Sequence, residues 1–270
     1  MVDARIEAVR RDLADVRLAE RVFSPHYAAP IARGVLARTP LLAHGDAGAA
    51  PLSELLPGER FEMLELTTDF AWGISATDGT VGYVATAALG DAVAPTHRVR
   101  AVRAAIRAEA RADAAETGAL PMGARVAATV AGGWAQVPGG FVAVSDLLIE
   151  GEFLTDYVAS AESLVGVAWR AGGRSGAGVD ATGLVFLALD MAGFPCPRFC
   201  DLQARALGRA IAPGEEAARG DLVYFAEHVA ILTDSDTAVH AGSGAVERIS
   251  VDALVGGGAH GDIVARRRLV

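Results

Sequence analysis

Three separate segments of this 270-residue sequence carry residue types that could together cleave an amide bond. The segment from Gly178 to Val185 has the composition of a loop that turns into a helix, with Asp180 at the N-cap position. Two later segments place His228 and His240 at the heads of successive strand-like runs. Amide cleavage by a nucleophile requires a thiol or hydroxyl at a helix start, a His base within hydrogen-bond reach and a third polar group that orients the base. Adjacent antiparallel strands would bring the two imidazoles side by side.

The order and spacing of these motifs resemble the NlpC/P60 family of papain-like cysteine peptidases. The family pattern is Asp-Cys-Ser-Gly-Leu-Val, then Gly-Asp-Leu-Val, His-Val-Gly-Ile and His-Ala, and this sequence has closely matching stretches at 180–185, 220–223, 228–231 and 240–241. The stretches 172–176 and 195–198 match the family as well. The resemblance covers residues 150–270. It implies a papain-like fold in which position 181 holds the nucleophile, His228 faces it and His240 stands behind.

The resemblance also implies which side chains line a substrate groove. They are Asp180, Thr182, Trp169, Arg174 and Ser175. Besides capping the helix, Asp180 would pair with the free amino group of a bound peptide.

Several positions depart from the family pattern. The nucleophilic Cys falls on Ala181, and a methyl group cannot attack a carbonyl carbon. Thr182 replaces a Ser, Ala171 replaces a groove Trp, and Glu227 stands where a small residue precedes the His. A single engineered Cys-to-Ala change would leave the rest of the motif intact, whereas natural loss of activity predicts several changes around the site. The changes at 171 and 227 favour natural loss.

The remaining thiols and imidazoles are expected to be structural or exposed. Cys196 and Cys200 lie four residues apart, which makes neither a disulfide framework nor a zinc-ligand pattern. A nucleophile relocated to Cys200 would lack the helix-start environment, so we expect an inert, packed thiol there. Without a His-Glu-x-x-His pattern, the sequence predicts no metal and no cofactor. We expect the other imidazoles in surface loops: His26, His44, His97 and His260.

The hydrophobic patterns from residue 150 to 270 predict the elements that would position these residues. Apolar spacing predicts helices over 153–167 and 182–192, and short apolar runs predict strands over 221–226, 229–233, 238–241 and 263–267. A helical part followed by an antiparallel strand series is the α+β fold class.

Residues 31–95 have a different texture, with short β-like runs broken by turns, and they predict a small β-barrel. An Asp78-Gly79 turn between two of the runs is a hairpin signal. The stretch Leu55–Glu59, the Trp at position 72 and Gly82-Tyr83-Val84 resemble a bacterial SH3 (SH3b) domain. In related peptidases such a domain helps to close the substrate site, so Tyr83 is a further candidate for the substrate wall.

Two further regions complete the expected organisation. Residues 96–149 repeat the barrel pattern more weakly and predict a second, degraded SH3b-like barrel, with a helix over 101–114 as the alternative. Residues 1–30 predict an amphipathic helix and a linker, because Ile6, Val9, Leu13 and Val16 recur at helical spacing.

Composition limits the classes of partner. There are 33 acidic residues against 24 basic ones, and the net charge of −9 argues against nucleic acid or an anionic membrane as a partner. No stretch approaches the ~20 apolar residues of a membrane span. The charged start lacks the apolar core of a signal peptide, so we expect a cytoplasmic location.

These observations predict a protein that recognises a murein-derived peptide such as L-Ala-γ-D-Glu-diaminopimelate, as in murein peptide recycling. Its scaffold would be that of a γ-D-glutamyl-diamino-acid cysteine endopeptidase, inactive because the nucleophile is missing. Two alternatives stay open. The chain is an active cell-wall peptide hydrolase whose Cys was changed to Ala, or a protein-interaction pseudoenzyme whose groove has been reused. Lysine in place of diaminopimelate fits the sequence equally well.

Overall fold

The computed structural model describes residues 2–212 and 214–269, and the chain divides into two compact units. Unit 1 contains the chain up to His97 together with Ala124–Thr129. Unit 2 contains Arg98–Gly123 and the chain from Val130 onward. The residues proposed for catalysis all belong to unit 2.

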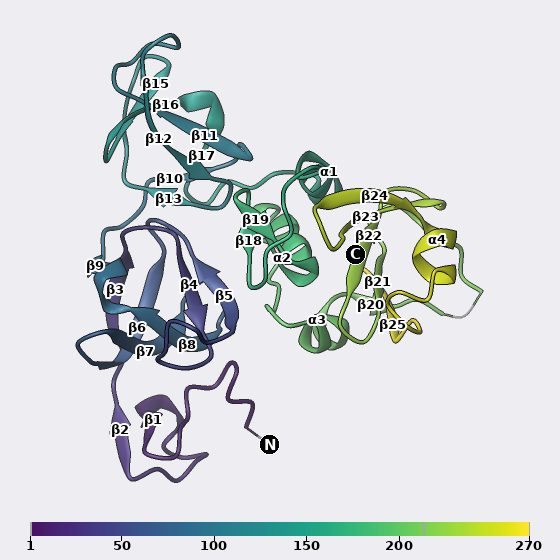
Figure 1. Ribbon diagram of the computed structural model, residues 1–270, viewed down its shortest axis with the longest axis horizontal. Helices are drawn as coiled ribbons and strands as arrows, with labels where there is room; N and C mark the ends of the chain where they lie inside the picture. Colours follow the sequence, from purple (N-terminus) through teal and green to yellow (C-terminus); the bar gives the residue numbers. More distant parts are fainter. Residues whose placement is uncertain (1, 213, 270) are drawn as a thin grey trace. The chain divides into compact units, whose positions relative to one another are not determined.

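Unit 1 is built on an antiparallel sheet with the strand order β5-β4-β8-β7-β6-β3-β9 (Figure 1). Its inward-facing side chains form one core, in which Leu41, Leu55 and Phe61 have no exposed surface. The β-like runs predicted between residues 31 and 95 fall on these strands. The strands and the short 3-10 turn between the last two are β3 (Ile31–Val35), β4 (Thr39–Leu42), β5 (Pro51–Leu55), β6 (Arg60–Leu66), β7 (Phe70–Ser75), β8 (Val81–Ala85), η2 (Thr86–Ala88) and β9 (Leu89–Asp91).

The predicted hairpin turn joins β7 to β8. Gly79 has a φ of +71°, a backbone conformation that residues other than glycine rarely adopt. Its N–H donates a hydrogen bond to the Ser75 carbonyl oxygen at 2.9 Å. The Asp78 carboxylate accepts a hydrogen bond from the Thr80 N–H at 3.0 Å and closes the turn.

The amphipathic helix predicted for residues 1–30 is wrong. Residues 2–30 instead contain the parallel strands β1 (Leu13–Asp15) and β2 (His26–Ala28), with the 3-10 turn η1 (Val16–Leu18) between them. The arginines of this segment pair with acids of β6: Arg10 with Glu65 at 2.6 Å, and Arg17 with Glu62 at 2.9 Å. These ion pairs to β6 and the β1–β2 pairing stabilise an extended backbone in this segment. Helical periodicity is only a weak local preference, so the contacts between distant parts of the sequence override it.

The region from 97 to 149 consists of short strands joined by loops and one 3-10 turn. The helix considered for 101–114 is not formed, because β11 pairs with β12 in antiparallel register, with Ala105 opposite Ala119. One sheet has the order β12-β11-β16-β15-β14. That this region is an SH3b barrel stays a prediction. Its elements are β10 (His97–Val99), β11 (Arg103–Arg107), β12 (Glu116–Pro121), β13 (Arg125–Val126), β14 (Thr129–Ala131), β15 (Trp134–Val137), β16 (Gly140–Ala143), η3 (Val144–Asp146) and β17 (Leu147–Ile149).

The rest of unit 2 combines helices with an antiparallel sheet of order β20-β25-β21-β22-β23-β24, so the predicted α+β class is confirmed (Figure 1). Helix α1 is shorter than predicted and begins after Asp156, which accepts hydrogen bonds from its first N–H groups. The elements α3, α4 and β24 were not predicted. The helices are α1 (Tyr157–Ser163), α2 (Ala181–Met191), α3 (Cys200–Ala206) and α4 (Val251–Gly256). The strands are β18 (Arg174–Ser175), β19 (Gly178–Val179), β20 (Arg209–Ala210), β21 (Leu222–Tyr224), β22 (Val229–Leu232), β23 (Thr237–Ala241), β24 (Val246–Ser250) and β25 (Ala265–Arg268).

Helix α2 is the centre of this region. All of its residues except Thr182 and Asp190 are buried, as expected of a helix that is apolar all round. It packs against β22 and β23. His228 directly precedes β22, and His240 lies on β23. A Cβ at Gly183 would press against the Gly173 carbonyl oxygen, so glycine is needed for this close approach.

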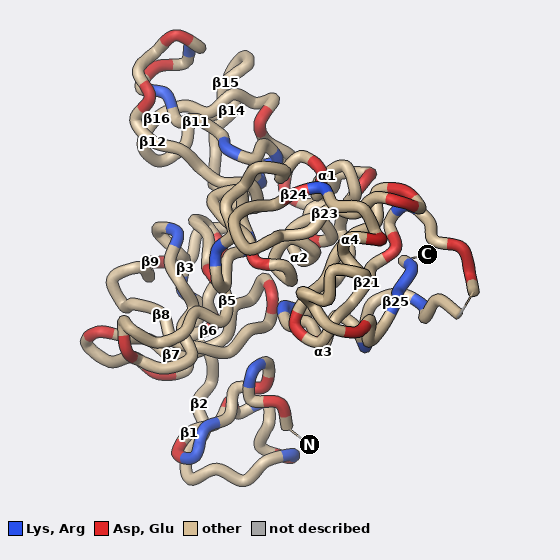
Figure 2. Tube along the Cα trace, turned by 45° about the vertical axis from the view of Figure 1, so that its right-hand side comes forward, with Lys and Arg blue, Asp and Glu red and all other residues tan. Residues whose placement is uncertain are grey.

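The sequence has more acidic than basic residues, and one arginine of the basic run on β25 is paired with acidic residues. Figure 2 shows this run on β25. Arg268 pairs with Asp221 at 2.6 Å and with Glu215 at 2.8 Å. Among the described residues, no helix combines the length and apolarity needed to cross a membrane.

Candidate functional site

The start of α2 is held by Asp180, its N-cap residue. Asp180 Oδ1 accepts hydrogen bonds from the Gly183 N–H at 2.7 Å and from Thr182 Oγ1 at 3.0 Å. Ala181 is the first residue of the helix and is 7% exposed. The backbone N–H groups of a first helical turn and the helix dipole favour negative charge at this place. Position 181 therefore has the backbone setting of a nucleophile but carries a methyl group.

The carboxylate of Asp180 also forms a buried ion pair that the sequence analysis missed. Its Oδ2 accepts hydrogen bonds from the Gly172 N–H at 2.9 Å and from Arg198 Nη2 at 2.5 Å. The Arg198 side chain is 2% exposed and also donates to Thr182 Oγ1. A peptide ammonium would have to compete with Arg198 for Asp180, so the predicted ammonium contact stays a prediction.

His228 and His240 lie side by side on the sheet, as predicted. His228 directly precedes β22, and His240 on β23 is opposite Ala230 in the antiparallel register. The two histidines are therefore diagonal neighbours on one face of the sheet. His228 Nε2 and His240 Nδ1 are 2.9 Å apart, and both rings are buried.

Both imidazoles are neutral near pH 7. Burial, with the neighbouring His260 and His240 rings adding to it, lowers the pKa of His228 to about 3. Burial also lowers the pKa of His240, against the opposing effect of Glu247. Because His228 Nε2 faces His240, its Nδ1 is the nitrogen left for taking a proton from a nucleophile.

His260 is the residue that the sequence analysis placed wrongly. It was expected in a surface loop, yet its ring stacks on that of His228 with centroids 3.8 Å apart and planes 6° apart. Its ring centroid is also 5.8 Å from that of His240. No spacing rule links His260 to the other two, because β24 and α4 intervene in the sequence.

Ala181 is linked to the His228–His240 pair through a shared hydrophobic core. Ala181 belongs to the same buried cluster as Val229 and Ala241, the chain neighbours of His228 and His240. That His228 faces the side chain at 181 stays a prediction.

Cys200 is the first residue of α3, so the expectation that it lacks a helix start is wrong, but its thiol lies against backbone carbonyl oxygens. Cys200 Sγ lies 3.6 Å from the carbonyl oxygens of Phe225 and His228, and burial raises the pKa of this thiol to about 11. Cys196 Sγ lies 3.4 Å from the Pro197 carbonyl oxygen. A thiol with a raised pKa is protonated and a weak nucleophile, in line with the expectation of inert thiols.

The remaining predicted groove residues of unit 2 have different surroundings. Trp169 is 43% exposed and available to a ligand. Arg174 is buried over the Phe186 ring, with the guanidinium carbon 5.3 Å from the ring centroid, and Ser175 has no exposed surface. Arg174 and Ser175 therefore support the fold in this structure, and their predicted contacts to substrate stay untested.

Tyr83 lies in unit 1, where its hydroxyl accepts a hydrogen bond from Arg10 at 2.9 Å. The Arg10 guanidinium also lies 4.4 Å from the centroid of the Trp72 ring. These contacts hold the N-terminal segment on the β-barrel. The role of Tyr83 as a substrate wall stays a prediction.

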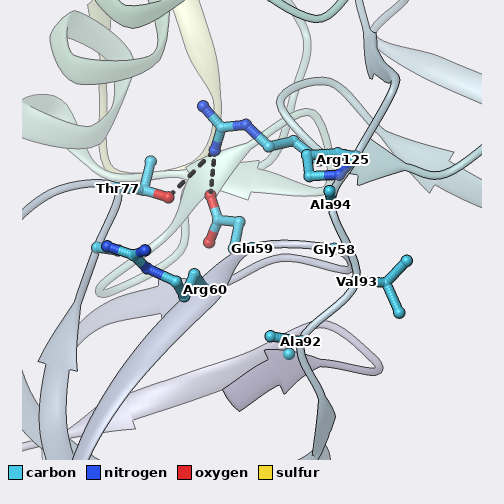
Figure 3. A pocket seen from close by; sticks show the side chains of 11 residues that line it. Gly58, Glu59, Arg60, Thr77, Ala92, Val93, Ala94 and Arg125 are labelled. Carbon is cyan, nitrogen blue, oxygen red and sulfur yellow. Dashed lines mark hydrogen bonds and ion pairs between the residues drawn. The ribbon is translucent and has the colours of Figure 1, made fainter. Parts of the chain in front are cut away.

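Unit 1 contains a cavity of about 430 Å³ between β6 and the segment 92–95. Figure 3 shows Glu59 and Arg125 at its edge, with Oε1 and Nη1 3.7 Å apart, and Thr77 Oγ1 3.2 Å from the same Nη1. Arg60 pairs with Glu62 at 2.8 Å. The charged groups here have partners within unit 1, so we assign no catalytic role to this cavity.

Comparison with known proteins agrees with this organisation. Residues 166–268 match the sequence model of the NlpC/P60 family, and residues 41–89 match that of the bacterial dipeptidyl-peptidase SH3 domain. No curated protein sequence matches the chain.

Two solved structures share the fold of this chain. An NlpC/P60 family protein from Bacillus cereus superposes with a TM-score of 0.74 over 88% of this chain and 99% of that one, at 15% identity. An NlpC/P60 endopeptidase from Photobacterium damselae gives a TM-score of 0.62 over 87% of this chain and 70% of that one, at 12% identity. The peptidoglycan hydrolase RipB from Mycobacterium tuberculosis is 30% identical over 42% of this chain and 63% of that one, with a TM-score of 0.36.

Proposed function

We propose that this chain, which carries an NlpC/P60 domain after a bacterial SH3 domain, recognises a murein-derived peptide without cleaving it. The peptide class is L-Ala-γ-D-Glu-diaminopimelate or its lysine counterpart. One observation carries the proposal: the helix start and the hydrogen-bonded His pair of a cysteine peptidase are both present, while position 181 is Ala. The cytoplasmic location expected from the sequence stays a prediction.

The missing step is attack on the peptide carbonyl. A cysteine peptidase transfers the thiol proton to His, forms a bond from sulfur to the carbonyl carbon and expels the amine. Ala181 offers no atom for that bond. The protonated thiol of Cys200 is held against backbone carbonyl oxygens and does not replace it.

Binding depends on other groups, which this structure retains. The exposed face of Trp169 offers apolar contact, and the N–H groups at the start of α2 favour a carboxylate or a carbonyl oxygen. The neutral His228–His240 pair can exchange hydrogen bonds with a peptide. Removing a nucleophile leaves these contacts in place.

Titration calorimetry of the unaltered chain with L-Ala-γ-D-Glu-diaminopimelate tests recognition. We expect saturable heat at a peptide concentration below the millimolar range. L-Ala-α-L-Glu-diaminopimelate is the matched control, because it has the same composition but a different backbone. An absence of heat at millimolar peptide would reject the proposal.

The variant Ala181→Cys tests whether only the nucleophile is missing. We expect it to hydrolyse the same peptide, while the unaltered chain, Ala181→Ser and the double variant Ala181→Cys/His228→Ala do not. Cleavage by the unaltered chain would contradict the proposed inactivity.

The two alternatives give different results. An enzyme whose Cys was changed to Ala predicts full recovery of hydrolysis by Ala181→Cys, whereas natural loss, with Ala171 and Glu227 also changed, predicts only partial recovery. A groove reused for a protein partner predicts a folded Ala181→Cys variant that neither binds nor cleaves the peptide.

A further inference from the structure

We propose that His228, His240 and His260 form a binding site for a divalent transition metal, with Zn²⁺ as the best-fitting ion. This inference does not rest on peptide recognition and goes beyond it. The sequence predicts no metal because it has no His-Glu-x-x-His pattern, and His260 was expected in a surface loop.

The three imidazole rings lie close together. One nitrogen from each ring lies within 4.8 Å of the other two. Zn–N bonds of ~2.0–2.1 Å in a tetrahedral site place ligand nitrogens roughly 3.3 Å apart. His228 Nε2 and His240 Nδ1, at 2.9 Å, already have nearly this separation. To bind an ion, the hydrogen-bonded His228 and His240 rings have to turn so that both nitrogen lone pairs face it, and His260 has to leave its stacked position so that its nitrogen faces it as well.

The chain allows this movement of His260. Its loop is rich in glycine, with φ of +64° at Gly258 and +76° at Gly261, and the space around both Cα atoms is open. His260 is partly exposed, whereas the other two rings are buried. Stacking on His228 already keeps the third ring next to the ligand nitrogens.

The second ring nitrogen of His240 has the partner that metal-bound histidines usually have. Glu247 is opposite His240 on β24, and its Oε1 lies 3.5 Å from His240 Nε2. His240 Nε2 is buried and makes no hydrogen bond among the described residues. A carboxylate at this nitrogen fixes the tautomer that leaves Nδ1 for a metal.

The ligand set indicates the class of ion. Three imidazoles with a fourth position open to water are typical of zinc sites, and imidazole also suits copper, nickel and cobalt. Calcium and magnesium prefer oxygen ligands, so we expect neither to bind here.

The test uses the full chain without a polyhistidine tag. Calorimetric titration with ZnCl₂ is expected to give one bound ion per chain, and CoCl₂ is expected to give the intense visible absorption of tetrahedral cobalt. MgCl₂ should give no heat.

Three variants locate the site. His260→Ala should weaken Zn²⁺ binding by more than the ~10–100-fold expected on losing an outer-shell partner, and Glu247→Gln by about that range. His26→Ala, in an exposed position of unit 1, should leave the affinity unchanged. Because His260 is only partly buried and Glu247 is largely exposed, we expect both variants to fold, which circular dichroism would check.

Three results would overturn the inference. They are no zinc binding by the unaltered chain at micromolar concentration, equal affinity in His260→Ala and the unaltered chain, or an equal loss of affinity in His26→Ala and His260→Ala. The last result would show nonspecific binding to surface imidazoles.

Discussion

At the scale of single residues, the candidate site combines an alanine at the start of α2 with a hydrogen-bonded pair of histidines. The His228 and His240 rings are buried and joined at 2.9 Å. Ala181 begins a helix whose cap makes four hydrogen bonds through one carboxylate. The chemistry that we propose for these residues is hydrogen bonding and metal ligation by imidazole, without transfer of an acyl group.

Burial of His228 makes folding stability depend on pH. Its pKa is about 3 in the folded chain and ~6.5 when unfolded, so between these values the unfolded state binds more protons. The stabilising effect of the neutral ring is complete above pH ~6.5 and is lost as pH falls toward 3. We expect the urea concentration at the unfolding midpoint to fall as the pH is lowered from about 7.5 to 5.5. The fall should be smaller in the variant His228→Gln.

His240 also has a lowered pKa, so part of the dependence should persist in that variant. His26→Gln, at an exposed position, is the control and should keep the full dependence. The same dependence of the urea midpoint on pH in His228→Gln and in the unaltered chain would contradict this account.

The Asp180–Arg198 pair predicts a clear stability effect. Arg198→Met leaves the Asp180 charge without its buried partner, and breaking a buried pair costs roughly 3–5 kcal/mol. We expect a cost near ~3 kcal/mol, since Asp180 keeps some solvent contact. Urea unfolding measures it. The double variant Arg198→Met/Asp180→Asn should cost less than the sum of the single changes, and simple additivity would show that the pair does not interact.

At the scale of elements, α2 and the strands β22 and β23 bring the site together. Helix α2 is buried almost all round, and its N-terminal end lies next to the glycine-rich turn between Gly172 and Gly178. The carbonyl of Gly173 approaches the helix so closely that a side chain at 183 would collide with it. The position of residue 181 therefore depends on backbone packing as well as on helix capping.

Substitutions at two helical glycines test whether close backbone packing fixes the start of α2. Ala favours a helix over Gly by ~1 kcal/mol, so Gly256→Ala in α4, where the space is open, should be neutral or stabilising. Gly183→Ala should instead destabilise the chain by ~1–3 kcal/mol, because the new methyl group overpacks the contact with Gly173. Thermal unfolding measures both, and stabilisation by Gly183→Ala would contradict the close approach.

At the scale of the whole molecule, a β-rich unit and an α+β unit each have their own core. The N-terminal segment is part of unit 1, fixed by Arg10, Arg17 and their acidic partners on β6. The proposed catalytic residues all belong to unit 2, whereas Tyr83 belongs to unit 1. Whether Tyr83 takes part in peptide recognition therefore has to be measured on the full chain, which contains both units.

Hydrogen exchange with bound peptide addresses that question. We expect slower exchange in 168–183 and in β22 and β23, and, if Tyr83 forms a substrate wall as predicted, also in β8. Tyr83→Phe keeps the ring and should retain the protection, whereas Tyr83→Ala should lose it in β8. Protection confined to unit 2 would remove Tyr83 from the site.

The sequence by itself determined the local features of this protein. Asp180 marked the start of α2, Asp78-Gly79 marked the hairpin, and short β-like or apolar runs marked β6, β7, β22 and β23. These features follow from capping, turn geometry and side-chain periodicity, which act over a few residues. The replacement at 181 was visible directly.

Only the tertiary structure decided which distant groups meet. His260 reaches His228 across an intervening strand and helix, Arg198 neutralises Asp180, and the arginines of the N-terminal segment pair with β6 instead of lying on a helix. Such contacts depend on the packing of elements far apart in the chain, and a local pattern contains no information about them. Long-range ion pairs and ring contacts therefore changed the assignment of individual residues, while the architecture of the NlpC/P60 domain followed the sequence motifs.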